Sequence, residues 1–156
     1  MKRFFVVCIA MVATMVSFIS CSSDKDEVNV IEQLVGNYNM KATMSVVLEN
    51  GEEQNVGTYE TIVSIVQTTD SSVKLSIKSF GKDHYVMPDI EVIGVTVDKI
   101  VDGIALLRMV NFDAIHNSVV YDGTIQGSYS NGNLALTMSV QPGQMPYPIN
   151  VVMKLK

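Results

Sequence analysis

The chain has 156 residues, a length that suits one globular domain. Hydrophobic residues make up 47% and charged residues 17%, which is too apolar for a disordered chain and too mixed for a polytopic membrane protein. The formal net charge is −5, whereas nucleic-acid binding needs clustered cations, so we expect no nucleic-acid partner. The absence of tryptophan and the presence of only two histidines and two cysteines leave little material for a metal, a cofactor or a catalytic centre.

Residues 1–20 are typical of an export signal. Met1-Lys2-Arg3 is a short basic start, and Phe4–Ile19 is a run of 16 residues without a charge. A helix that spans a bilayer needs about 20 apolar residues, so this shorter run predicts a cleaved signal peptide. A membrane anchor that is retained is the alternative.

The end of that run, Phe18-Ile19-Ser20-Cys21, resembles the lipobox of bacterial lipoproteins. The resemblance implies cleavage before Cys21 and lipid on its thiol and on its new amino group; a chance cysteine is the alternative. Several acyl chains, at about 0.8 kcal/mol per buried CH₂, hold a protein on a membrane durably. With Cys8 removed and Cys21 blocked, the mature chain is expected to have no internal disulfide.

Residues 21–33 are expected to form an acidic flexible tether after the lipidated cysteine. The stretch Ser22–Glu27 reads SSDKDE, and it resembles the surface-export signal of lipoproteins in one large group of Gram-negative gut bacteria. The resemblance implies an outer-membrane protein that faces the cell exterior. A solvated spacer that only keeps the domain off the lipid is the alternative.

From Leu34 onwards apolar and polar residues alternate, which is the pattern of half-buried strands. We expect strands over residues 34–48, 56–68, 73–78, 90–100, 104–112, 119–129, 134–140 and 147–155. Asn-Gly pairs at 50–51 and 131–132 tolerate positive φ and predict hairpin turns. Segments 83–89 and 114–118 are expected to be irregular connections, and no segment after the signal has a convincing helical period.

Eight strands joined mostly by tight turns favour an all-β antiparallel meander that closes into a barrel and so removes its sheet edges. Barrels of about eight strands are filled by side chains or hold one small ligand. A β-sandwich is the structural alternative. An outer-membrane barrel also alternates, but acylation is a way to tether a soluble domain and argues against it.

The domain over residues 34–156 resembles the calycin-like β-barrel domain of bacterial surface lipoproteins. The resemblance rests on the opening Leu34–Tyr38, the strand Val73–Phe80, the segment Ile90–Val92 and the hairpin formed by Gly123–Gly127 and Asn133–Leu136. It implies a lipocalin-like barrel without catalytic residues and, by analogy of fold, room for an apolar ligand.

Methionines and tyrosines on the predicted strand faces are the candidates for a ligand site. They are Tyr38, Met40, Met44, Tyr121, Met138 and Met153. Methionine is flexible and fits adaptable ligands, although core filling is the plainer interpretation. Met87-Pro88 and the loop Gln141–Pro148 place Met, Tyr and Pro where an exposed apolar rim would contact a partner or cap a barrel mouth.

Metal and catalytic chemistry have few candidates. His84 and His116 lie in predicted loops without the further ligands that zinc needs, so no metal site is expected. There is no Gly-x-Ser-x-Gly elbow, and a hydrolase would depend on Ser128, Ser130 or His116. Paired carboxylates would need the fold to bring together members of the set Glu60, Glu91, Asp98 and Asp122.

We therefore expect a non-enzymatic, membrane-anchored lipoprotein whose barrel binds a small apolar ligand. The alternative is a structural or accessory subunit of a surface assembly that binds protein or glycan through its loops. A hydrolase is the third hypothesis.

Overall fold

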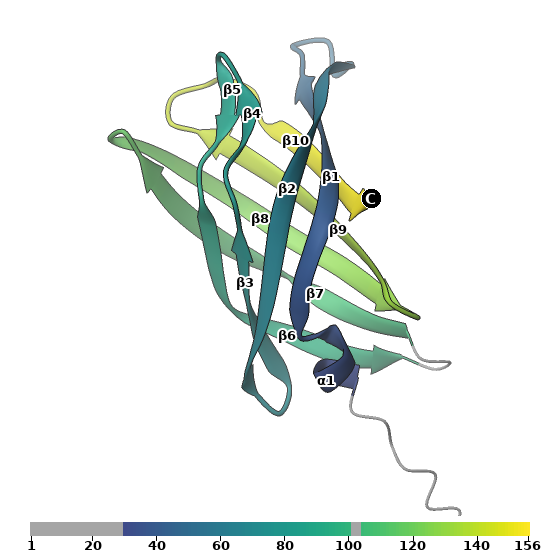
Figure 1. Cartoon of the computed structure of the whole chain (residues 1–156). Helices are drawn as coiled ribbons and strands as arrows, with labels where there is room; N and C mark the ends of the chain where they lie inside the picture. The colour runs from purple at the N-terminus through teal and green to yellow at the C-terminus, as the bar shows by residue number, and fades with distance from the viewer. Residues whose placement is uncertain (1–29, 101–103) are drawn as a thin grey trace, which may run out of the picture.

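The structure, a computed structural model, describes residues 30–100 and 104–156. The predicted signal peptide, Cys21 and residues 21–29 of the predicted tether lie outside the described residues. Eight strands form a closed barrel, with a short helix at one end and a two-stranded hairpin at the other (Figure 1). The elements are α1 (Val30–Leu34), β1 (Gly36–Val47), β2 (Glu53–Thr69), β3 (Ser72–Ile77), β4 (Phe80–Lys82), β5 (Tyr85–Met87), β6 (Ile90–Ile100), β7 (Ile104–His116), β8 (Val119–Ser130), β9 (Asn133–Pro142) and β10 (Ile149–Leu155).

The barrel is an up-and-down meander. Its strand order is β1-β10-β9-β8-β7-β6-β3-β2, and β1 pairs with both β2 and β10, which closes the sheet on itself. All the pairs are antiparallel, and β4 and β5 form a separate hairpin inserted between β3 and β6. The expected all-β antiparallel barrel is confirmed, and the β-sandwich alternative is wrong.

Alternation along the strands places one face of each strand in a common hydrophobic core. On β1, Met40, Ala42 and Met44 are buried and the residues between them are not. Thr61 is the only buried polar residue in the described part of the chain, and its hydroxyl donates to the Lys78 carbonyl at 2.7 Å. The barrel interior is therefore filled with apolar side chains along most of its length.

Two glycines on β8 let neighbouring side chains lie against the backbone. A Cβ at Gly123 would stand 2.7 Å from the Phe112 ring, and a Cβ at Gly127 would stand 2.5 Å from Leu136. Phe112 and Leu136 are both buried. The glycine pair thus provides space for core side chains from the two flanking strands.

The structure differs from the sequence prediction at three places. Residues 85–87, expected to be irregular, form β5, and residues 114–116 extend β7. Residues 30–33, expected to belong to the flexible tether, form most of α1, and Val30 and Ile31 are buried. None of the helices in the described residues is long and apolar enough to cross a membrane.

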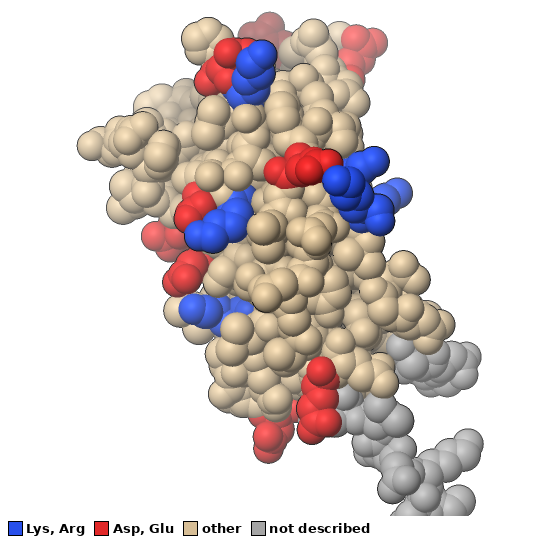
Figure 2. Space-filling view, in the orientation of Figure 1, with Lys and Arg blue, Asp and Glu red and all other residues tan. Residues whose placement is uncertain are grey.

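Many of the charges on the visible face lie in small groups of opposite sign, acidic side chains alone lie at its lower end, and uncharged surface separates the groups (Figure 2). Three ion pairs join Lys74 to Glu91 at 3.5 Å, Lys78 to Asp89 at 3.1 Å and Lys156 to Glu60 at 2.7 Å, and a fourth joins Arg108 to Asp98. Exposed pairs of this kind contribute little to stability because water screens them.

Candidate functional site

Helix α1 closes one end of the barrel. Val30, Ile31 and Leu34 are buried. A helix leaves its last carbonyl groups without partners inside the helix, and two phenols satisfy them here. The Tyr38 hydroxyl donates to the Leu34 carbonyl at 2.7 Å, and the Tyr129 hydroxyl donates to the Gln33 carbonyl at 2.9 Å.

The closed end also shifts the pKa of one tyrosine, Tyr38. Burial raises the pKa of Tyr38 above its ordinary value, and the nearby Tyr129 raises it further because two phenolates would repel each other. Tyr38 therefore stays protonated and keeps donating its hydrogen bond to α1 beyond the pH at which an exposed tyrosine ionises.

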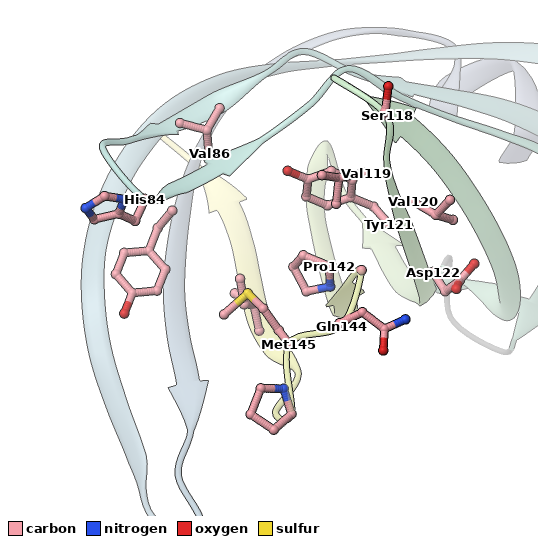
Figure 3. A pocket seen from close by; sticks show the side chains of 14 residues that line it. His84, Val86, Ser118, Val119, Val120, Tyr121, Asp122, Pro142, Gln144 and Met145 are labelled. Carbon is pink, nitrogen blue, oxygen red and sulfur yellow. The ribbon is translucent and has the colours of Figure 1, made fainter.

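The opposite end, which we call the mouth, is open and carries a pocket of about 930 Å³. Three segments line it: residues 84–86 of the β4–β5 hairpin, residues 118–122 at the start of β8, and residues 142–146 at the end of β9 and in the loop that follows, with Ile149 of β10. Figure 3 shows His84 and Val86 on one side, Val119 and Tyr121 on the other, and Met145 between them.

The pocket has an apolar floor and a polar rim. Pro142 and Ile149 are buried at the floor, and Tyr121 and Met145 are half-buried. At the rim, exposed polar groups come from His84, Asp122 and Gln144. An apolar hollow with a few polar groups at its edge is the usual composition of a small-molecule site.

The β4–β5 hairpin is fixed at its stem. Phe80 and Met87 point into the core, where they are 5% and 0% exposed. The Asp89 carboxylate accepts a hydrogen bond from the Ser79 backbone N–H at 2.7 Å and from Lys78 Nζ at 3.1 Å. These two donors, the backbone N–H first, hold the pKa of Asp89 below its ordinary value.

The loop after β9 is fastened on both sides. The Gly143 N–H donates to the Val120 carbonyl at 2.7 Å, and the Gln141 side-chain amide donates to the Met145 carbonyl. Beyond the pocket, Tyr147 hydrogen-bonds Glu49, which raises the pKa of Tyr147. The Pro-rich loop is therefore held in place by hydrogen bonds and forms one wall of the pocket.

The structure separates the six residues predicted for a ligand site. Four of them, Met40, Met44, Met138 and Met153, lie on the adjacent strands β1, β10 and β9 inside the barrel and are 0–3% exposed. Tyr38 lies at the α1 end, and Tyr121 alone lines the mouth pocket. The ligand-binding role of the six stays a prediction.

Sequence reasoning missed most of the pocket's lining. His84 and Met145 lie outside the strands, and Tyr85 begins β5, a short strand in a segment that was expected to be irregular. The available signal was the clustering of Met, Tyr and Pro in the segment 141–148, which predicted an apolar rim at a barrel mouth.

The catalytic candidates do not come together. His116 ends β7 at the mouth, whereas Ser128 and Ser130 lie near the α1 end of β8. Glu60, Glu91 and Asp98 each form an ion pair with a basic residue on the surface, and Asp122 lies at the mouth rim. The described residues contain no group of three or more His, Cys, Asp or Glu that could hold a metal ion.

One solved structure has a fold similar to that of this chain. The crystal structure of BF2706 from Bacteroides fragilis NCTC 9343, named a "putative outer membrane protein", has a TM-score of 0.65 and 22% sequence identity over 82% of this chain. The chain spans about half of that protein, 52% of its length. Rv2717c from M. tuberculosis is more distant, with a TM-score of 0.37 and 8% identity over 81% of this chain and 94% of that one.

No curated protein matches the chain. The sequence profile described as "Calycin-like beta-barrel domain" matches residues 34–154, which is most of the chain and runs from the end of α1 into β10, the last barrel strand. The chain therefore belongs to the calycin-like β-barrel domain family.

Proposed function

We propose that this chain is a cell-envelope lipoprotein, anchored through Cys21, that binds a small apolar ligand in the mouth pocket. The mouth pocket itself carries the proposal. Its volume of about 930 Å³ is within the range of small-molecule sites, and its floor is made of buried Pro142 and Ile149.

The packing of the barrel supports a site at the mouth rather than deep inside. At the level of Met40, Met44, Met138 and Met153 the side chains are buried and pack into one core cluster. A ligand in that layer would have to displace them, and protein cores are packed too densely for this to be favourable. The mouth needs no such rearrangement.

The position of α1 supports the anchoring half of the proposal. The chain enters the barrel at Val30, at the end opposite to the mouth (Figure 1). A lipid on Cys21 would therefore hold the α1 end toward the membrane and leave the pocket open to the medium. The name of the B. fragilis protein favours the outer membrane, and the stretch SSDKDE favours its external side.

Binding is tested with N-phenyl-1-naphthylamine, a neutral apolar probe whose fluorescence rises in an apolar pocket. We expect saturable binding to the wild type and at least several-fold weaker binding to Met145→Gln, which makes the pocket wall polar. Met109→Gln is the matched control, because Met109 is 61% exposed and lies outside the pocket. Equal loss in both variants, or no saturable binding to the wild type, would contradict the pocket.

The anchor is tested separately in cells. We expect the wild-type chain in the membrane fraction with a mass increased by acyl groups, and Cys21→Ser in the soluble fraction. Proteinase K added to intact cells should degrade the wild type, and replacement of Asp24, Asp26 and Glu27 by alanine should protect it. An unmodified Cys21 on a released product would overturn the anchoring.

The accessory-subunit hypothesis uses the same end of the molecule, because Gln144 and Pro146 are exposed on the loop after β9. Crosslinking from Gln144→Cys on whole cells separates the two hypotheses. Recovery of a protein or glycan bound there, together with absence of probe binding, would favour the accessory subunit.

A further inference from the structure

The ladder between β6 and β7 covers only part of these two strands, and we call the gap beyond it the seam. These strands pair only through Val97–Ile100 and Ile104–Leu107. The ladder stops next to the ion pair of Arg108 with Asp98. Beyond this ion pair, β7 pairs only with β8 as far as His116. On the other side of the seam, Ile90–Thr96 of β6 pairs only with β3.

The consequence is a free strand edge along the part of β7 that is nearest the mouth. Within the described residues, Met109–His116 has a ladder partner on one side only. Alternate N–H and C=O groups along such an edge are available to another strand. Natural edges are commonly blunted by lysine or proline, but this stretch contains neither, and Asp113 is its only acidic residue.

The exposure of apolar side chains is a second, independent observation at the same place. The three most exposed large hydrophobic residues of the described chain are Ile115 at 71%, Ile93 at 69% and Met109 at 61%. Ile115 and Met109 lie on β7, and Ile93 lies on β6 across the seam. An edge and an apolar surface together are the features that β-strand addition uses.

We propose that a second copy of this chain pairs with this edge, β7 against β7, in an antiparallel register with its two-fold axis at Phe112. In that register Met109 faces the partner's Ile115, and Asn111 faces the partner's Asp113. Each side chain on the outer face then meets a neighbour of matching chemistry, because directly opposite residues in antiparallel strands contact each other.

The sequence of the edge favours a second copy as the occupant. A two-fold interface uses the same patch twice, so the patch has to be complementary to itself. Side chains alternate between the two faces with a period of two, so the nearest other registers that keep the same residues on the outer face have their two-fold axis at Asp113 or at Asn111. One shift would place Asp113 opposite the partner's Asp113, and the other would place Met109 opposite the partner's Asp113. The Phe112-centred register avoids both mismatches.

The register is tested by disulfide formation in membranes of cells that make the full chain. Asn111→Cys and Asp113→Cys are co-expressed with different tags and exposed to a mild oxidant. We expect the mixed disulfide to exceed either homodisulfide severalfold, since residues 111 and 113 are opposite only across the two chains. The wild type controls for the native cysteines, and Thr137→Cys, on the fully paired strand β9, controls for random collisions.

A substitution without cysteine chemistry provides the second measurement. Ile115→Lys, added to both tagged chains, should lower the mixed disulfide severalfold, because the two-fold axis makes each substitution act twice. Ile62→Lys is the matched control: Ile62 is 45% exposed, but its backbone pairs with Asn39 of β1 on one side and accepts a hydrogen bond from the Lys78 N–H on the other. Thermal unfolding of each variant confirms that the barrel is intact.

The outcomes are decisive in both directions. A dominant mixed disulfide that Ile115→Lys removes and Ile62→Lys leaves supports the dimer. Equal amounts of mixed and homodisulfides, no disulfide above the Thr137→Cys level, or a disulfide to a different protein would each overturn it. None of these outcomes depends on ligand binding at the mouth.

Discussion

The two ends of the barrel are made by the same eight strands, yet one is sealed and the other is left open. At the α1 end, Leu34 is buried and two tyrosine hydroxyls satisfy carbonyls of the helix. At the mouth, three turns stand around a hollow whose wall includes the exposed side chains of Val86, Val119 and Val120. Apolar side chains therefore remain exposed around the hollow at the mouth.

Because of this difference, we expect the residues that determine stability and the residues that bind a ligand to lie at opposite ends of the barrel. The residues that seal the α1 end belong to the continuous core cluster, so changes there should affect the whole barrel. The residues of the mouth lie on turns and on the strand ends next to them, so changes there should affect the pocket first. Four experiments test this separation, from the largest expected effect to the smallest.

The largest effect is expected from truncation of the seal. Leu34→Ala should lower the free energy of unfolding by about 2–5 kcal/mol, the usual cost of removing a buried leucine side chain. Met145→Ala, in the half-exposed pocket wall, should lower it by less than about 1 kcal/mol. Urea unfolding measures both. Similar losses in the two variants would show that the ends are equally coupled to the core.

Substitution of a glycine at the mouth should lower both probe binding and stability. Gly81 has φ of +110°, and a Cβ there would stand 2.0 Å from the Tyr85 carbonyl oxygen, so Gly81→Ala forces β4 away from β5. We expect probe binding to fall severalfold and the free energy of unfolding to fall by about 1–3 kcal/mol. Gly51→Ala is the control, because its φ is +80° but nothing lies within 4 Å of the added Cβ. Unchanged probe binding would exclude the hairpin from the pocket's function.

The hydrogen bonds to α1 should contribute less than the apolar seal. Tyr129→Phe removes the donor to the Gln33 carbonyl and should lower the free energy of unfolding by about 0.5–1.5 kcal/mol. Tyr38→Phe should cost a similar amount, since it removes the donor to Leu34. Thermal unfolding of both single variants and of the double variant measures these costs. A double variant as stable as the wild type would mean that water replaces both phenols.

The smallest effects should come from pH, and they should have opposite signs at the two ends. The pKa of Tyr38 is raised on folding, so its contribution is complete below about pH 10 and is lost as pH rises through the raised pKa. The pKa of Asp89 is lowered on folding, so its contribution is complete above about pH 4 and is lost as pH falls through the lowered pKa. Unfolding of the wild type, Tyr38→Phe and Asp89→Asn across both ranges checks the two signs, and a variant that keeps the wild-type pH profile would contradict the assignment for its end.

Alternation in the sequence was sufficient to predict the barrel and most of its core. It worked where a strand buries one whole face, as on β1 and β9. It failed on β7 because a bulge between Leu107 and Val110 changes which residues point inward, so Ala114 no longer continued the earlier pattern. It also missed α1, since five residues are too few to show a helical period.

The pocket could not be predicted in the same way, because its walls are far apart in the sequence. Tyr85, Tyr121 and Met145 meet only after the meander has brought three turns to one end. The methionines predicted for a ligand site were identified by side-chain type and by strand face, which select core residues and mouth residues alike. Distinguishing the two requires knowing how far along the barrel axis each residue lies.

The place where the chain enters the barrel also decides how the domain resists mechanical force. A pull on Val30 directed away from the mouth is passed through α1 to the start of β1, which runs between β2 and β10. Such a load acts parallel to the strands, so it strains the ladders on both flanks of β1 in shear instead of opening them one rung at a time. The Tyr129 hydroxyl on Gln33 adds a link from α1 to β8, so part of the load reaches a distant strand directly.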